Sequence, residues 1–383
     1  MYIVSMIQRN FELLRLKQSI ENNPVTAIVG PRQCGKTTLA SLVGADHRFD
    51  LENPRDLVRM ADPQLLLEKC KGLIVIDEVQ EKPELFSLIR YLVDSIPDQK
   101  YVLLGSASGA LINGSSESLA GRIAYIELGG LRLSETGAQS IQTHWLRGGL
   151  PRSFTAKTDK ISKNWLENYI ATFLERDLPR LGMNIPSRSL RRFWIMLSHY
   201  HGQVFNASEI GRSMDMSDAT ARRYLDILEG ALLVRVLRPW FNNTSKRLVK
   251  SPKIYLRDSG VFHSLQSIDT FENLQSHPKL GASWEGYALE EVARATGVPY
   301  QSLWFWAVHS GSELDLMWQH SGKNWGVEFK YSGSPIITQS MKIACEELEL
   351  EHLWVVHAGE EKYSLAKNIT ALPLQMVGDE WEY

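Results

Sequence analysis

The chain has 383 residues, of which 44% are hydrophobic and 22% are charged, and its formal net charge at pH 7 is −2. This length is sufficient for two or three domains, and the composition is that of an ordinary globular protein. The sequence has no run of 18 apolar residues, which excludes a membrane-spanning helix, and its N-terminus lacks the pattern of a signal peptide. The three cysteines lack metal-like spacing, so we expect a cytoplasmic protein.

The charge is unevenly distributed along the chain. Residues 1–257 carry 35 Lys and Arg against 26 Asp and Glu, whereas residues 258–383 carry 7 against 18. A polyanion is therefore expected to bind the first two-thirds of the chain.

The N-terminal third predicts an α/β unit. An amphipathic helix is expected over residues 1–20, and short apolar strands then alternate with helical segments. The expected strands are 25–29, roughly 47–51, 73–76, 101–104 and 123–126. This alternation is typical of a sheet with helices on both faces.

The segment after the first strand fits the pattern G-x-x-x-x-G-K-[ST] at every fixed position. It consists of Gly30, Pro31, Arg32, Gln33, Cys34, Gly35, Lys36 and Thr37, and Thr38 continues into a helical stretch. A strand before and a helix after are the context that a phosphate-binding loop requires. Backbone N–H groups and the helix N-terminus would hold the phosphates, with Lys36 at the β- and γ-phosphates and Thr37 on Mg²⁺. ATP and Mg²⁺ are the predicted ligands; the alternative is a glycine turn with an unrelated lysine.

A second motif favours hydrolysis of the nucleotide. Four apolar residues, 73–76, are followed by Asp77 and Glu78. At the end of a buried strand, Asp77 can hold the Mg²⁺ hydration shell and Glu78 can polarise the attacking water. The alternative is a solvated acidic turn.

Two further polar residues are candidates for the same site. Ser106 follows the strand 101–104 and could contact the γ-phosphate, or it could be an ordinary turn serine. Arg122 precedes the strand 123–126 and could act as an arginine finger from a neighbouring subunit, although most arginines are solvated surface residues. The finger hypothesis implies a homo-oligomer.

The middle of the chain predicts mainly helices. Residues 163–174 place Trp165, Tyr169, Ile170 and Phe173 on one face, where core packing is the favoured interpretation.

A winged helix-turn-helix is predicted next. Helices at 207–213 and 218–229, the second capped by Ser217, precede two strands at 232–237 and 253–256. The expected DNA-backbone contacts are Arg222, Arg223, Lys246, Arg247, Lys250 and Lys253. The alternative is a helical lid that packs on the nucleotide-binding unit.

The last hundred residues contain a second group of carboxylates. Asp315 and Glu328 are expected on adjacent strands, with Lys330 on the same face and Glu285 on a preceding helix. Such a group can bind Mg²⁺ and activate water for phosphodiester cleavage. The alternative is an alternating strand with a surface Glu-x-Lys pair.

Taken together, these motifs resemble a family of prokaryotic AAA-type ATPases whose C-terminal part is a domain of unknown function, DUF4143. The markers are residues 30–39, Asp77-Glu78-Val79-Gln80, Leu119-Ala120-Gly121-Arg122, Leu133-Ser134-Glu135, Gly148-Gly149-Leu150-Pro151, Glu175-Arg176-Asp177 and residues 246–255. The resemblance implies a three-layer P-loop ATPase domain, a winged helix and a small α/β domain similar to PD-(D/E)xK restriction-endonuclease-like nucleases. We place them at residues 1–200, 201–260 and 261–383.

The same resemblance suggests roles for single residues. Ser106 resembles a sensor residue, Arg122 matches the suspected arginine finger, and Asp315, Glu328 and Lys330 match the nuclease-like motif. The chain departs from the family pattern at Trp306-Ala307, where Trp-Arg is expected.

The sequence therefore predicts an oligomeric, Mg²⁺-dependent ATPase that acts on DNA. The alternative is an ATP-driven switch that binds a protein partner through an inactive nuclease-like domain. A third hypothesis is a nuclease for which ATP is only a structural ligand.

Overall fold

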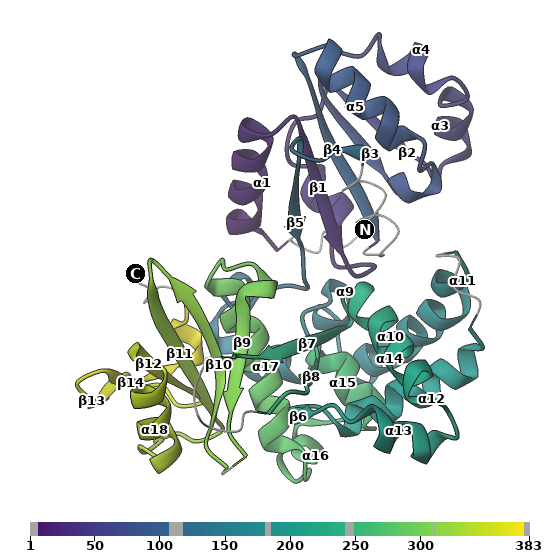
Figure 1. Ribbon diagram of the computed structural model, residues 1–383. Helices are drawn as coiled ribbons and strands as arrows, with labels where there is room; N and C mark the ends of the chain where they lie inside the picture. Colours follow the sequence, from purple (N-terminus) through teal and green to yellow (C-terminus); the bar gives the residue numbers. More distant parts are fainter. Residues whose placement is uncertain (1–6, 107–117, 181–184, 242–248, 310, 379–383) are drawn as a thin grey trace.

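The computed structural model describes residues 7–106, 118–180, 185–241, 249–309 and 311–378. Its first part contains a five-stranded sheet in which every strand is parallel to its neighbours, in the order β2-β3-β4-β1-β5 (Figure 1). The strands are β1 (Val25–Gly30), β2 (His47–Asp50), β3 (Gly72–Asp77), β4 (Gln99–Ser106) and β5 (Ile123–Glu127). Each strand begins and ends within two residues of its predicted range, so the α/β prediction is confirmed.

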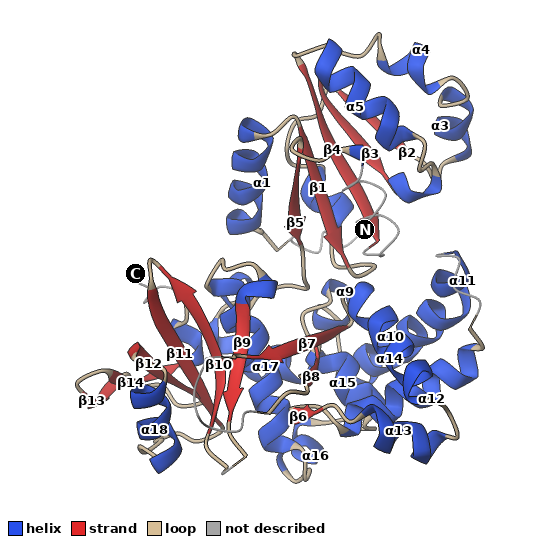
Figure 2. Cartoon of the chain, viewed as in Figure 1, coloured by secondary structure: helices blue, strands red, loops and turns tan. Residues whose placement is uncertain are grey.

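Helices cover both faces of this sheet, as Figure 2 shows. They are α1 (Asn10–Asn22), α2 (Lys36–Ala40), α3 (Pro54–Arg59), α4 (Pro63–Leu67) and α5 (Leu85–Ser95). Successive side chains of a strand point to opposite faces. Accordingly, Ile28 of β1 packs in one core with Leu16 of α1, whereas Ala27 packs in another with Ile89 of α5. The helix expected over residues 1–20 corresponds to α1, which begins at Asn10.

The chain then forms a helical part. Its helices are α7 (Leu133–Thr136), α8 (Ile141–Arg147), α9 (Pro151–Phe154), α10 (Asp159–Thr172), α11 (Leu178–Arg180) and α12 (Ser187–His199). A π-helical turn, Phe173–Asp177, follows α10 directly. Tyr169 and Ile170 are buried and Trp165 packs against the same core, which confirms the predicted role of this aromatic face.

A second sheet occupies the C-terminal half. It has nine strands in the order β13-β14-β12-β11-β10-β9-β7-β8-β6. The strands are β6 (Gln203–Val204), β7 (Val234–Pro239), β8 (Lys253–Leu256), β9 (Leu303–Ala307), β10 (Glu313–His320), β11 (Lys323–Lys330), β12 (Leu350–His357), β13 (Tyr363–Ala366) and β14 (Ile369–Pro373). The accompanying helices are α13 (Ala207–Met214), α14 (Asp218–Gly230), α15 (Ser259–Leu265), α16 (Phe271–Gln275), α17 (Leu280–Ala295) and α18 (Gln339–Glu347).

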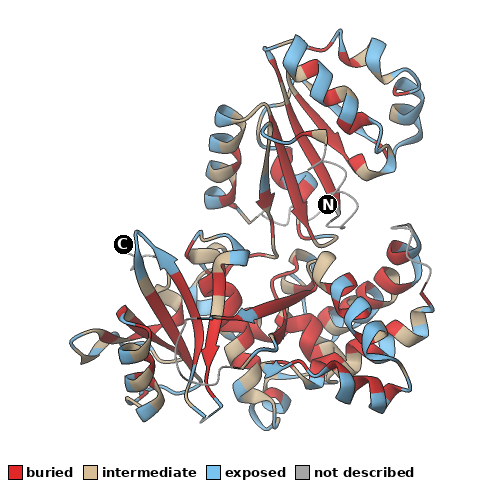
Figure 3. Cartoon of the chain, in the orientation of Figure 1, coloured by how far each residue is buried: buried red, intermediate tan, exposed pale blue. Residues whose placement is uncertain are grey.

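The β7-β8 hairpin that follows helices α13 and α14 is part of this larger sheet. Strand β7 pairs in parallel with β9, where Arg238 lies opposite Trp304 and Pro239 opposite Phe305. This pairing joins the hairpin to the C-terminal sheet, and Figure 3 shows that both sheets are buried along most of their length. The sequence could not predict this, because it depends on an apolar strand about seventy residues further along the chain.

Within the part of the chain that the structure describes, no helix has the length and apolar character needed to cross a membrane.

Candidate nucleotide site and C-terminal carboxylate cluster

The loop between β1 and α2 has the backbone of a phosphate-binding loop. Gly35 has a φ of 103° immediately before α2 begins at Lys36, a conformation that glycine adopts without a Cβ clash. Gly30 packs so tightly that an added Cβ would lie 2.3 Å from the carbonyl oxygen of Leu128. The loop therefore leads directly into the N-terminus of α2, and helix N-termini are where anions bind.

Lys36 and Thr37 are already positioned by hydrogen bonds. The buried Lys36 Nζ donates to the carbonyl oxygens of Gly30 at 2.9 Å and Pro31 at 3.0 Å. Thr37 Oγ1 donates to Asp77 Oδ2 at 2.7 Å, so the loop and the end of β3 meet. A hydroxyl and a carboxylate oxygen side by side are ligands that Mg²⁺ accepts, and the residues present fit Mg²⁺ with a nucleotide.

Glu78 follows Asp77 in a left-handed backbone conformation, with a φ of 53°. Backbone strain of this kind in a non-glycine residue is concentrated at functional sites. Burial raises the pKa of both carboxyl groups, and the Glu78 side chain accepts a hydrogen bond from the Gln80 amide. Glu78 lines the same cavity as the phosphate-binding loop, as the general-base prediction requires.

This cavity has a volume of about 750 Å³ and two different walls. One wall is the phosphate-binding loop, and the other comes from the helical part and includes Arg152, Tyr169 and Arg176. Arg32 of the loop pairs with Asp177 of the π-helical turn at 3.1 Å. The sequence marked the Arg176-Asp177 pair but did not predict that it faces the loop, because that contact depends on the π-helical geometry of residues 173–177.

Arg9 is another residue that sequence reasoning missed. Its guanidinium donates to the backbone oxygens of Cys34 and Gly130 and pairs with Glu135 at 3.0 Å. It therefore connects the phosphate-binding loop to the segment that follows β5. A lone arginine before a helix gives no sign of this role.

Ser106 and Arg122 lie at opposite ends of the strands of the first sheet. Ser106 ends β4 and pairs in register with Gly30, so its backbone lies beside the phosphate-binding loop. Arg122 lies beside the start of β1, where its carbonyl oxygen accepts from Val25 N, roughly 20 Å of strand away from the loop. Its guanidinium pairs with Asp94 at 2.7 Å. Arg122 does not enter the site of its own chain, and its role in a neighbouring subunit stays a prediction.

The predicted DNA contacts fall into three groups. Arg222 and Arg223 on α14 and Lys250 before β8 are exposed. Lys246 and Arg247 lie outside the described residues. The prediction for Lys253 is wrong, because its side chain is 5% exposed and faces carboxylates of the C-terminal part.

Two of the C-terminal carboxylates lie beside Lys253, and a third pairs with Lys330. Lys253 Nζ lies 3.5 Å from Asp315 Oδ1 and 3.7 Å from Glu285 Oε1, and Lys330 Nζ donates to Glu328 Oε1 at 2.8 Å. Burial raises the pKa of Glu285 to about 7 and that of Glu328 to about 8, and the Asp315 charge adds to both shifts. Burial alone would lower the pKa of Lys253, but the surrounding carboxylates raise it.

This cluster does not fit a divalent metal ion. Among the described residues, no group of three or more His, Cys, Asp and Glu side chains is arranged to hold a metal. The prediction that Glu285, Asp315 and Glu328 are metal ligands is therefore not met, because an ammonium group occupies the position between the first two.

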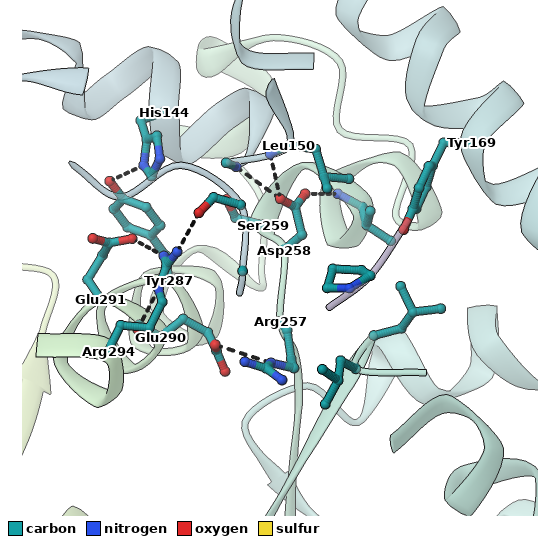
Figure 4. A pocket seen from close by; sticks show the side chains of 17 residues that line it. His144, Leu150, Tyr169, Arg257, Asp258, Ser259, Tyr287, Glu290, Glu291 and Arg294 are labelled. Atoms are coloured by element: carbon teal, nitrogen blue, oxygen red, sulfur yellow. Dashed lines mark hydrogen bonds and ion pairs between the residues drawn. The ribbon is translucent and has the colours of Figure 1, made fainter. Parts of the chain in front are cut away.

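A third group of charges joins the parts of the molecule at an internal cavity (Figure 4). Arg257 pairs with both Glu127 at the end of β5 and Glu290 on α17. Asp258 accepts hydrogen bonds from the backbone N–H groups of Gly149 and Leu150 at 2.9 and 3.2 Å. The first sheet, the helical part and the C-terminal part are thus connected through partly buried polar contacts.

The fold and the loop geometry define the class, and family models agree with it. An AAA domain model (AAA_14) matches residues 22–137, a domain of unknown function (DUF8612) matches residues 138–272, and DUF4143 matches residues 280–377. The protein carries an AAA-type ATPase domain followed by a DUF4143 region, as the sequence predicted.

Two relatives match over most of the chain. They are the uncharacterized proteins Mb2031c of Mycobacterium bovis and Rv2008c of Mycobacterium tuberculosis, each 46% identical over 376 residues, with 97% of this chain and 85% of the relative covered. The chain therefore belongs to the same family as these two mycobacterial proteins.

Solved structures give more distant matches. The Walker-type ATPase PABY2304 of Pyrococcus abyssi has 18% identity and a TM-score of 0.49, with 68% of this chain and 96% of that chain covered. The DNA clamp loader delta protein of Bacillus subtilis has 12% identity and a TM-score of 0.26, with 56% and 86% covered.

Proposed function

We propose that this protein is a Mg²⁺-dependent ATPase. The observation that supports the proposal is the hydrogen bond from Thr37 Oγ1 to Asp77 Oδ2 at 2.7 Å. Thr37 lies in the first turn of α2, directly after the glycine-containing loop. Bound Mg-ATP would supply the phosphoanhydride bond and the charge that neutralises the phosphate oxygens. Lys36 would exchange its bonds to Gly30 and Pro31 for bonds to phosphate oxygens.

Glu78 is the proposed general base. Its carboxylate is part-buried, lines the cavity and is held by Gln80, so it is positioned to orient a water molecule and accept its proton. Arg176 and Arg152, which line the opposite wall, would balance phosphate charge within the same chain.

The test compares two variants with a control. Lys36→Ala is expected to abolish binding of a fluorescent ATP analogue. Glu78→Gln is expected to retain that binding and to lower the hydrolysis rate by about 100-fold or more, since general-base catalysis contributes that much. Glu81→Gln, an exposed carboxylate three residues further on, is the matched control and should leave both unchanged. Full hydrolysis by Glu78→Gln would remove Glu78 from the mechanism.

In a neighbouring subunit, Arg122 is proposed to act as an arginine finger. Its pair with Asp94 is at the surface, with side chains 36% and 50% exposed, so a partner's phosphates can compete for the guanidinium. Mixing Arg122→Ala with Lys36→Ala subunits would test this. ATP hydrolysis should reappear in the mixture, because an Arg122→Ala subunit supplies an intact nucleotide site and a Lys36→Ala subunit supplies an intact Arg122. A mixture as inactive as the two separate variants would exclude this role of Arg122.

DNA-backbone binding is a second proposed function. It is favoured by exposed arginines on two packed helices, α12 and α14, whose Phe193 and Tyr224 rings lie 5.4 Å apart. The exposed arginines are Arg188, Arg191, Arg192, Arg222 and Arg223. No acidic residue occurs between Asp177 and Glu209. The arrangement of α12, β6, α13, α14 and the β7-β8 hairpin supports a winged-helix interpretation, with the arginines binding phosphates.

The salt dependence of duplex binding tests this second function. Arg222→Gln/Arg223→Gln should reduce the slope of log affinity against log salt by about 0.9 for each phosphate that the variant no longer neutralises. Lys69→Gln/Lys71→Gln, two exposed lysines of the first part, is the matched control. An unchanged slope in the arginine variant would refute this surface. ATP hydrolysis without DNA binding would favour the alternative of a switch with a protein partner.

Nuclease chemistry is not part of the proposed function. Of the carboxylates on which it would depend, Asp315 and Glu285 lie 3.5 and 3.7 Å from the ammonium group of Lys253, and Glu328 pairs with Lys330.

A further inference from the structure

Lys253 of β8 is surrounded by carboxylates that come from two other elements. Its Nζ lies 3.5 Å from Asp315 and 3.5 Å from Glu313, both on β10, and 3.7 Å from Glu285 on α17. The side chain is 5% exposed, and its ammonium lies 5.6 Å from the centre of the Phe305 ring. A buried charge needs a partner of opposite sign, and here three carboxylates share one cation.

The oxygens of this cluster also accept hydrogen bonds from neutral donors. Tyr255 OH donates to Glu285 Oε1 at 2.6 Å, and the Phe329 N–H donates to Asp315 Oδ2 at 3.0 Å. A Mg²⁺ ion requires oxygens at about 2.0–2.1 Å in near-octahedral geometry. The ammonium and such an ion would compete for the same carboxylate faces, and two adjacent cations would repel each other in a buried site.

We infer that Lys253 is the permanent cation of this cluster and stands in place of a divalent metal ion. The cluster then holds no metal ion, and its ion pairs connect strand β8 to α17 and β10. This inference goes beyond ATP hydrolysis and does not depend on it, because the cluster contains no residue of the nucleotide site.

Removal of the ammonium should convert the cluster into a metal site. Without Lys253, Asp315 and Glu285 lose their cation, while Glu328 Oε2 is buried and has no hydrogen-bond partner among the described residues. Glu328 keeps its bond to Lys330 through Oε1. The carboxylates of Asp315 and Glu285, with the remaining oxygen of Glu328, then offer oxygen ligands for a hard cation such as Mn²⁺.

The experiment measures Mn²⁺ binding to the full, nucleotide-free chain by electron paramagnetic resonance. Wild type is compared with Lys253→Met, Lys253→Met/Asp315→Asn and Asp315→Asn, and Lys250→Met, an exposed lysine three residues earlier, is the matched control. Lys253→Met is expected to gain one Mn²⁺ site with an affinity at least tenfold above that of wild type. The additional Asp315→Asn change should remove that site, and the control should equal wild type.

Two outcomes would overturn the inference. One is a wild-type Mn²⁺ site that Asp315→Asn removes, because the metal would then bind despite Lys253. The other is a folded Lys253→Met protein that gains no site. If circular dichroism shows that Lys253→Met does not fold, wild type and Asp315→Asn decide: equal Mn²⁺ binding supports the inference, and lower binding in Asp315→Asn refutes it. Binding at Asp77 does not interfere, since it is common to both proteins.

Discussion

The ion pairs around Glu290 allow a quantitative prediction of stability. Glu290 lies on α17, is 4% exposed, and accepts hydrogen bonds from Arg235 and from Arg257 at 3.3 Å. Arg257, whose contact with Glu290 is drawn in Figure 4, also pairs with Glu127, so these ion pairs connect α17 to the end of β5. The change Glu290→Gln keeps the shape of the side chain and removes the charge that compensates two buried guanidinium groups.

The expected cost follows from the pKa of Glu290. Burial alone would raise this pKa, but Arg235 and Arg257 lower it from 4.5 to about 2. Since one pKa unit corresponds to about 1.4 kcal/mol, the charged form is stabilised in the folded protein by about 3 kcal/mol. The loss of one partner from a buried pair costs a similar amount, about 3–5 kcal/mol.

Equilibrium urea unfolding followed by tryptophan fluorescence is the assay. At pH 7, Glu290→Gln should lower the free energy of unfolding by about 3 kcal/mol. Because the folded pKa lies below the unfolded one, this stabilisation is complete above pH 4.5 and is lost as the pH falls toward 2. At pH 3.5 the difference between the two proteins should therefore be about 1 kcal/mol smaller.

The control is Glu351→Gln, which removes a surface pair with Lys323 whose side chains are about half exposed. It should cost less than about 1 kcal/mol. If Glu290→Gln costs no more than this control, or if its cost does not decrease between pH 7 and pH 3.5, the buried ion pairs do not hold the junction together.

Three other predictions concern single contacts. Gly30→Ala should abolish binding of the fluorescent ATP analogue, because its Cβ would lie 2.3 Å from the Leu128 oxygen; retained binding would contradict this. Ser217→Ala should lower the free energy of unfolding in urea by about 1 kcal/mol, since Ser217 Oγ accepts from Thr220 N at the start of α14. Arg176→Gln should raise the Kd for the analogue about tenfold or more, the value of a charged hydrogen bond, and an unchanged Kd would exclude Arg176 from the site.

Local patterns predicted much of the first part of the chain. The strands before and after residues 30–37 are short apolar runs, and the loop between them has a spacing that a phosphate-binding backbone requires. Ser217 was predicted as an N-cap from its residue type and position alone, and its bond to Thr220 confirms it. These features are determined by neighbours in sequence, which is why they could be predicted.

Interactions between distant segments could not be predicted in the same way. Arg9 reaches the phosphate-binding loop, and Arg176 lines the nucleotide cavity through a π-helical turn that no local pattern indicates. The hairpin strand β7 joins β9 through a pairing that depends on the packing of both parts. In each case the partner lies far away in the sequence, so its identity follows only from the tertiary structure.

Strand β8 explains why Lys253 was expected to contact DNA and instead faces carboxylates. Side chains alternate along a strand, and Ile254 and Leu256 pack in the core shared with helices α13 and α14. The opposite face presents Lys253 to Asp315, and Arg257 follows toward Glu127 and Glu290. A run of cations without acids looks the same in sequence whether its partners are phosphates or distant carboxylates. Burial distinguishes the two, and through Lys253 and Arg257 the β8 segment contacts both the C-terminal part and the first sheet.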